Sequence, residues 1–98
     1  MNEVYTLIKE YIPIKNTLRE KENGEFLILA NKNSDIYYLN NMAKVMYLLI
    51  DNKISINDIY TKIKQEYEVN DDELKVDIID FIRDLQWKKL ILLKEVIK

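Results

Sequence analysis

The spacing of apolar residues changes at Asn40, from a pattern typical of strands to one typical of helices. Before this point, residues 36–39 read Ile-Tyr-Tyr-Leu, four β-formers in a row. After it, apolar residues recur at intervals of three and four, which predicts a helix over residues 41–50. Asn40 is a good N-cap, because its side-chain oxygen can accept a free backbone N–H. A strand that ends at a helix cap can leave one of its edges open to another chain.

Three strands are predicted up to this switch, and they form an antiparallel meander. Residues 15–22 make the first strand and lead into Asn23-Gly24, a dipeptide that favours a hairpin turn because both residues tolerate positive φ. Residues 25–30 make a more apolar and therefore central strand, and residues 31–34 make a polar turn. The third strand covers residues 35–39.

Two more helices are predicted after the first. A turn at Asp51-Asn52 precedes a second helix, which is capped by Ser55 or by Asn57. A third helix starts at the acidic residues 71–73, because negative charge suits the positive end of the helix dipole. It runs to about residue 89.

The two ends of the chain have a less regular pattern. Apolar spacing over residues 4–12 suits a short helix that ends before Pro13, although a strand or a mobile arm fits as well. Residues 90–97 suit a last strand or a packed tail. We therefore expect an N-terminal arm over residues 1–13 and one α+β domain over residues 14–98, with a three-stranded antiparallel sheet followed by three helices.

The faces of the third helix can be separated by taking 100° per residue. The core-facing arc comprises Leu74, Ile78, Phe81, Ile82 and Leu85. To one side of this arc lie Lys75, Ile79, Arg83 and Gln86. On the other side lie Asp77, Asp80, Asp84 and Lys88, which we expect to be solvated. The apolar extension at Ile79 is thus the feature that a simple core face does not explain.

The composition argues against catalysis. The chain has no histidine and no cysteine, which removes the commonest general base, thiolate nucleophiles and the usual metal ligands. Its only glycine is Gly24, so a glycine-rich phosphate loop is excluded. The 17 Asp and Glu residues are scattered at surface spacing. We expect a non-catalytic protein that needs no cofactor and no metal.

The chain also lacks the signals of membrane or export proteins. No apolar run approaches the 18 or more residues of a membrane span, and no secretory signal is apparent at the N-terminus. The cytoplasm is the expected location.

The order of the elements, and the residues within them, resemble the PqqD-like family, the precursor-peptide recognition elements of ribosomal peptide modification pathways. The resemblance covers residues 13–91. The matching residues are Pro13, Arg19-Glu20, Gly24-Glu25, Leu27-Ile28, Tyr38-Leu39-Asn40, Ala43, Leu49-Ile50-Asp51, Ile56, Ile59, Tyr67, Asp77-Ile78, Phe81-Ile82, Leu85 and Leu90-Ile91. One departure is Asp51-Asn52, where the family often has Asp-Gly, but asparagine tolerates the same left-handed geometry.

The resemblance implies a winged-helix-like fold and a free-standing adaptor that binds leader peptides. In the family, the leader adds as an extra strand beside the third strand, over a groove shared with the third helix. The strand then covers residues 35–39 and the helix about residues 72–89. The expected peptide-binding residues on the strand are Asp35, Ile36, Tyr37, Tyr38 and Leu39. On the helix they are Lys75, Ile79, Arg83 and Gln86, which follow from the helical wheel, together with Ile82 from the edge of the core-facing arc. Which face of the strand meets the guest, Ile36/Tyr38 or Tyr37/Leu39, stays open.

The implied partners are a precursor peptide and a modifying enzyme, most plausibly a radical S-adenosylmethionine (radical SAM) enzyme, with a lasso-peptide leader protease as the close alternative. DNA binding is a rival, because many winged helices read DNA. However, residues 71–84 carry six acidic side chains against Lys75 and Arg83, and the net charge is −2, so DNA phosphates would be repelled. A homodimer or structural subunit is a third alternative, since an open strand edge can pair with a second copy.

Overall fold

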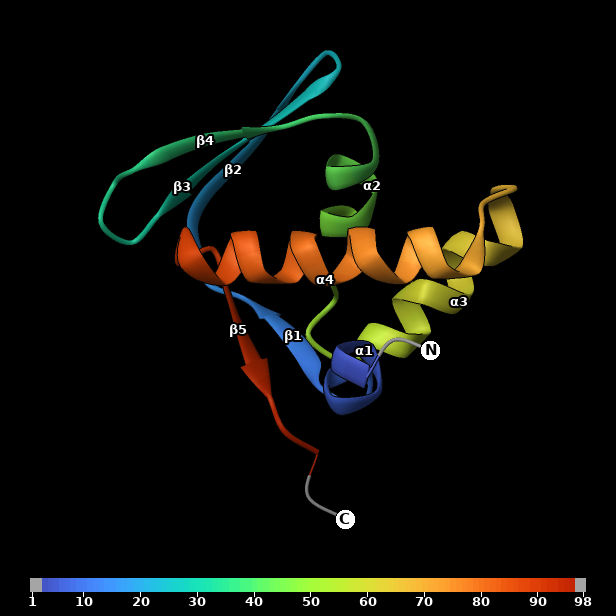
Figure 1. Cartoon of the computed structure of the whole chain (residues 1–98). Helices are drawn as coiled ribbons and strands as arrows, with labels where there is room; N and C mark the ends of the chain where they lie inside the picture. The colour runs from blue at the N-terminus through green and yellow to red at the C-terminus, as the bar shows by residue number, and fades with distance from the viewer. Residues whose placement is uncertain (1–2, 97–98) are drawn as a thin grey trace.

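The computed structural model describes residues 3–96. The elements are α1 (Glu3–Ile8), β1 (Ile12–Lys15), β2 (Thr17–Asn23), β3 (Phe26–Asn31), β4 (Ile36–Leu39), α2 (Asn41–Leu49), α3 (Ile56–Glu66), α4 (Asp71–Trp87) and β5 (Ile91–Lys94). In Figure 1, α4 crosses the molecule, with the β2-β3-β4 sheet and α2 on one side and β1, β5 and α1 on the other. The predicted α+β class, with a three-stranded antiparallel sheet followed by three helices, is confirmed. No helix within residues 3–96 has the length and hydropathy needed to cross a membrane.

The turn between β2 and β3 lies one residue later than the sequence predicted. Asn23 pairs with Phe26, so the two-residue loop is Gly24-Glu25 and not Asn23-Gly24. Gly24 has a φ of 64°, while Glu25 is not among the residues with positive φ. In a type II′ hairpin turn, only the first of the two loop residues has a positive φ, and it is usually glycine. The twist of this turn matches that of the flanking strands.

The predicted strand over residues 15–22 is in fact two strands that belong to different sheets. β1 pairs with β5, whereas β2 pairs with β3. The break falls at Asn16, whose N–H donates to the Leu90 carbonyl (2.9 Å). Pro13 lies inside β1 and does not simply end a helix as expected. Proline is tolerated there because a two-stranded sheet consists only of edge strands.

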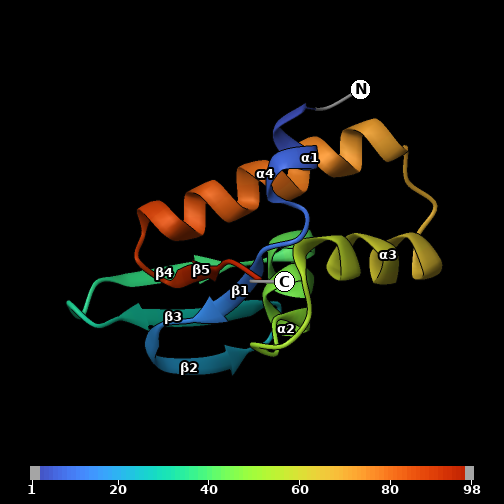
Figure 2. The same cartoon turned by 90° about the horizontal axis from the view of Figure 1, so that it is seen from below.

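The N-terminal segment packs against the helices. Tyr5 of α1 is only 3% exposed, and its hydroxyl donates to Asn57 Oδ1 (2.8 Å). The backbone N–H groups of Ile56 and Asn57 donate to the carbonyls of Tyr11 and Lys9, both at 2.9 Å. Figure 2 shows α1 crossing α4. Residues 3–11 therefore cover part of α4 and hold the start of α3.

The three long helices begin at polar caps, but the caps work differently. Ser55 starts α3 in a capping box with Asp58, and the Asn70 side chain accepts the N–H groups of Asp72 and Glu73 at the start of α4. Asn40 is the N-cap residue of α2 as predicted, yet its side chain makes no capping bond. The next residue, Asn41, has a φ of 50°, outside the right-handed helical range in which an N-cap side chain normally reaches the first turn.

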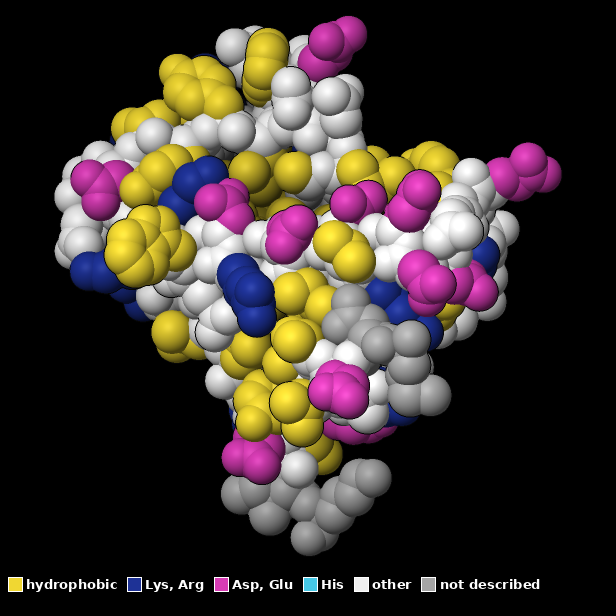
Figure 3. Space-filling model, in the orientation of Figure 1, with side chains coloured by type: hydrophobic (Ala, Val, Ile, Leu, Met, Phe, Trp, Pro, Cys, Tyr) yellow, Lys and Arg dark blue, Asp and Glu magenta, His cyan; other side chains and the backbone are white. Residues whose placement is uncertain are grey.

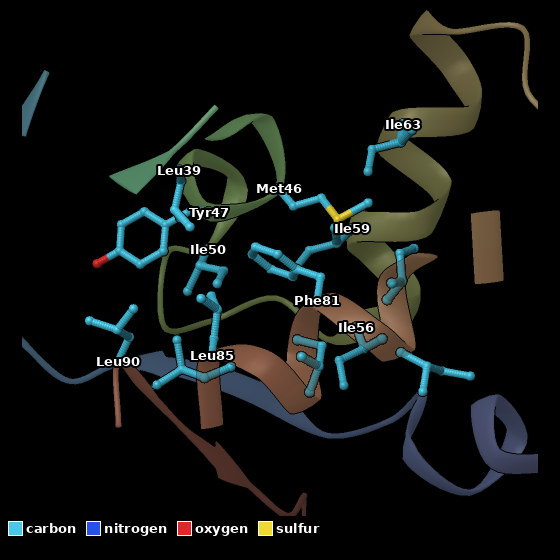
Figure 4. Packing of buried hydrophobic residues seen from close by; sticks show 14 of the residues in the cluster. Leu39, Met46, Tyr47, Ile50, Ile56, Ile59, Ile63, Phe81, Leu85 and Leu90 are labelled. Carbon is cyan, nitrogen blue, oxygen red and sulfur yellow. The ribbon is translucent and has the colours of Figure 1, made fainter. Parts of the chain in front are cut away.

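The core lies between α4 and the other helices. It also includes Leu27, Leu29 and Leu39, which form the face of the β2-β3-β4 sheet that packs on the helices. Figure 4 shows Leu39, Met46, Ile50 and Phe81 pointing into this core from β4, from α2 and the residue after it, and from α4. Tyr47 is fully buried, and its hydroxyl donates to Glu20 Oε2 (3.0 Å). Burial raises the pKa of Tyr47 well above its usual range, so this hydroxyl stays protonated.

Candidate functional site

The β2-β3-β4 sheet has two edges of very different character. β2 reads Thr-Leu-Arg-Glu-Lys-Glu-Asn, with four charged side chains in seven residues, whereas β4 reads Ile-Tyr-Tyr-Leu and has none. Natural proteins use charge to keep exposed edges from pairing with other chains. No other strand described in residues 3–96 pairs with the free edge of β4. β4 is therefore the edge of this sheet that is suited to accept a guest strand.

The backbone groups that β4 offers to a guest can be identified from its register. The Asn31 N–H donates to the Asp35 carbonyl (3.0 Å), and the same register continues through Ala30↔Ile36 to Leu27↔Leu39. Hydrogen-bonded and non-hydrogen-bonded pairs alternate along an antiparallel ladder. Tyr37 and Leu39 consequently bond to β3, and the N–H and C=O groups of Ile36 and Tyr38 point to the open edge.

The side chains of β4 alternate between a packed face and a solvent face. Leu39 is buried and Tyr37 is half-buried, whereas Ile36 and Tyr38 are 54% and 63% exposed. The Tyr38 ring lies edge-on to that of Phe26, with centroids 6.2 Å apart, on the outer face of the sheet. The Tyr37/Leu39 face is therefore the one turned towards α4, and which of the two faces meets a guest stays a prediction.

A groove of about 350 Å³ runs between the end of β4, α2 and α4. Its lining consists of Leu39, Met42, Ala43, Met46, Asp77, Asp80, Phe81 and Asp84. The apolar members form the floor, and the three aspartates form a rim along α4. Figure 3 shows this arrangement as hydrophobic side chains in a hollow above α4, bordered by a row of carboxylates. A groove of this kind suits an extended peptide that carries an apolar side chain.

The start of β4 is tied to the end of α4 through Asn31, the one buried polar residue among those described. Its side-chain amide donates to Asp35 Oδ2 (3.0 Å) and to the carbonyl of Lys88 (2.9 Å). Its Oδ1 accepts the N–H groups of Asn33 (2.9 Å) and Asp35 (3.0 Å). These bonds set the spacing between the two walls of the groove.

Lys88 links β4 to the Asp84 end of the rim. Its ammonium lies 5.1 Å from the centre of the Tyr37 ring and 2.8 Å from Asp84 Oδ2. The cation thereby joins the inner face of β4 to the acidic rim of α4.

The sequence matches the family described as coenzyme PQQ synthesis protein D (PqqD) over residues 25–91, which is more than half of the chain. This protein belongs to the PqqD family. The resemblance inferred from the sequence is thus confirmed. No curated protein sequence gives a significant match.

Two solved structures share the fold of this PqqD-family protein. TbiB1 in complex with the TbiA(beta) leader peptide has a TM-score of 0.71 at 20% identity, covering 80% of this chain and 92% of that chain. Lasso peptide synthetase B1 complexed with the leader peptide has a TM-score of 0.69 at 18% identity, covering 85% and 98%. At these identities the likeness establishes the fold.

The structure separates the predicted strand residues from the predicted helix residues. Residues 36–39 form β4, and Asp35 lies just before it, bonded to Asn31. Ile79 and Ile82 are only 5% and 1% exposed and belong to the core, and neither lines the groove beside β4, so their part in peptide binding stays a prediction. The helical wheel could not show that another element covers this side of α4.

The other predicted helix residues also lie away from β4. Arg83 and Ile79 line a second hollow with Val4 of α1, and Asp80 borders both this hollow and the groove. Lys75 lies over the rings of Tyr5 and Tyr60, with its ammonium 5.4 and 5.5 Å from their centres, and Gln86 is exposed. The side of α4 that borders the groove is the aspartate side, which the wheel had assigned to solvent.

Replacing Asn31 with alanine is expected to lower the free energy of unfolding by about 2–4 kcal/mol, because its four side-chain hydrogen bonds are lost together and a cavity is left at a buried position. Urea denaturation measures this effect. Asn33→Ala, at an exposed position of the same loop, is the matched control and should change the free energy by less than about 0.5 kcal/mol. Equal midpoints for the two variants would mean that Asn31 does not hold β4 to α4.

Proposed function

We propose that this PqqD-family protein is a non-catalytic, cytoplasmic adaptor that binds the leader segment of a ribosomally made precursor peptide and presents it to a modifying enzyme. The observation that carries the proposal is the juxtaposition of an uncharged, unpaired strand edge with an apolar groove. Strand addition needs the first feature, and side-chain selection needs the second.

In this proposal the leader lies beside β4 as a fourth strand of the sheet. Its backbone bonds to the N–H and C=O groups of Ile36 and Tyr38, which supplies affinity that depends little on leader sequence. Alternate guest side chains point to opposite faces of the sheet. One set enters the groove over Leu39 and Phe81, and the other lies beside the exposed ring of Tyr38. The groove therefore supplies the selectivity.

The modifying enzyme is proposed to be either a radical SAM enzyme or a lasso-peptide leader protease. The name of one solved relative, lasso peptide synthetase B1, supports the second type, and the family description, coenzyme PQQ synthesis, links the fold to a different pathway. Genes adjacent to the one for this protein provide the test. A short precursor reading frame beside a gene for either enzyme would support that enzyme as the partner.

Peptide selection followed by amide exchange tests the binding mode. A displayed library of random 12-residue peptides is selected on the purified protein, and amide exchange is then followed by NMR with one enriched peptide. We expect the N–H groups of Ile36 and Tyr38 to exchange fast in the free protein and slowly in the complex. Those of Tyr37 and Leu39 should be protected in both states, because they already bond to β3.

Two results would contradict the proposal. One is the failure of the library to yield any enriched peptide, and the other is protection that appears only away from β4. Sedimentation at several concentrations serves as the control, because a second copy of the protein pairing at this edge would protect the same amides without any peptide.

A further inference from the structure

The rim of the groove carries three carboxylates, and only one of them is paired with a positively charged side chain. Asp77, Asp80 and Asp84 all line the groove, and all three are exposed. Only Asp84 has a cationic partner, Lys88. Among the residues that the structure describes, neither Asp77 nor Asp80 makes an ion pair or a side-chain hydrogen bond. Two carboxylates are therefore free to meet a ligand at the lip of an apolar floor.

We infer that the groove selects peptides in which an apolar side chain is flanked by lysine or arginine. This inference rests on the proposed function and adds the chemistry of the guest. An apolar side chain suits the floor formed by Leu39, Met42 and Phe81. A cation beside it suits Asp77 and Asp80, whereas an acidic side chain at that place would be repelled.

The dimensions of the two walls agree with this guest. Asp77 and Asp84 are seven residues apart on α4, which corresponds to about 10 Å along a helix. Side chains on one face of a strand are about 7 Å apart, so an apolar residue and a cation two positions away both fit beside this length of helix. The aliphatic stem of lysine or arginine can lie on the apolar floor while its charged end reaches the rim.

The acidic rim acts on selectivity more than on affinity. Ion pairs between exposed groups contribute little individually and are weakened by salt. The backbone bonds at Ile36 and Tyr38 are available to any extended peptide. A preference for basic over acidic sequences beyond the effect of overall charge is therefore assigned to the rim, and it should shrink as the salt concentration rises.

Parallel peptide selections test the inference. The library of random 12-residue peptides is selected on the wild-type protein, on Asp77→Asn/Asp80→Asn and on Glu68→Gln/Glu95→Gln. The last variant removes the same net charge at exposed positions that do not line the groove. We expect wild type and control to enrich lysine and arginine two positions from an apolar residue, and the rim variant to lose that enrichment. A peptide selected on wild type should bind the rim variant about two- to tenfold more weakly at low salt.

The outcomes separate the inference from the function on which it rests. Peptides that protect Ile36 and Tyr38 but show no basic enrichment, or keep it on the rim variant, overturn the inference and leave the proposed function intact. Failure to select any peptide on the wild type overturns the proposed function, and the inference with it. Thermal melts establish that the variants are folded, and Asp80→Asn alone replaces the double variant if that one does not fold.

Discussion

Replacing Tyr38 with proline is expected to weaken binding of a selected peptide about tenfold or more while the domain stays folded. The Tyr38 N–H points to the open edge, so proline removes no bond within the sheet. It does remove a donor that a guest strand needs, and leaving the guest carbonyl without a partner costs about 1–3 kcal/mol, where about 1.4 kcal/mol corresponds to tenfold in affinity. Fluorescence anisotropy of a labelled peptide measures the affinity, and a thermal melt reports on the fold.

Two companion variants make this experiment specific. Tyr38→Ala removes the exposed ring and keeps the N–H, so it should bind with nearly wild-type affinity if the backbone carries the interaction. Tyr37→Pro removes a donor that bonds to β3 and should lower the melting temperature. Wild-type affinity in Tyr38→Pro would exclude strand addition at this edge. A larger loss of stability in Tyr38→Pro than in Tyr37→Pro would show that the ladder alternates in the opposite phase.

Replacing Ile79 with glutamate is expected to unfold the domain or to lower its free energy of unfolding by about 3 kcal/mol or more. Ile79 is 5% exposed and lies in the core beside α1. A carboxylate there is taken out of water among apolar side chains, and the exposed Arg83 in the same hollow offsets only part of that desolvation cost. Urea denaturation followed by circular dichroism measures the difference.

The matched control for this prediction is Val76→Glu. Val76 lines the same hollow beside α1 but is 46% exposed, so its carboxylate can remain hydrated and the cost should stay below about 1 kcal/mol. If Ile79→Glu instead folds like the wild type and loses peptide affinity, the groove lies on the α1 side of α4 and our assignment is wrong.

Local patterns predicted most of the elements because each pattern is a property of neighbouring residues. The strand at residues 36–39 and the three helices after it follow from apolar spacing, and the caps at Ser55 and Asn70 from short polar side chains at helix starts. The break at Asn16 was missed because it depends on a bond to Leu90, 74 residues away in sequence. No local signal shows that Lys15 and Thr17, two residues apart in sequence, belong to strands of different sheets.

The candidate site shows the same division between local and long-range information. Apolar spacing and the absence of charge identify residues 36–39 as an open strand edge, and the helical wheel correctly separates Ile79 from the aspartate side of α4. The wheel contains no information about which side meets β4. That choice depends on contacts between distant segments: α1 covers Ile79, and Asn31 holds the end of α4 against β4. Such contacts form only when the whole chain packs, because they bury surface that no single element can bury alone.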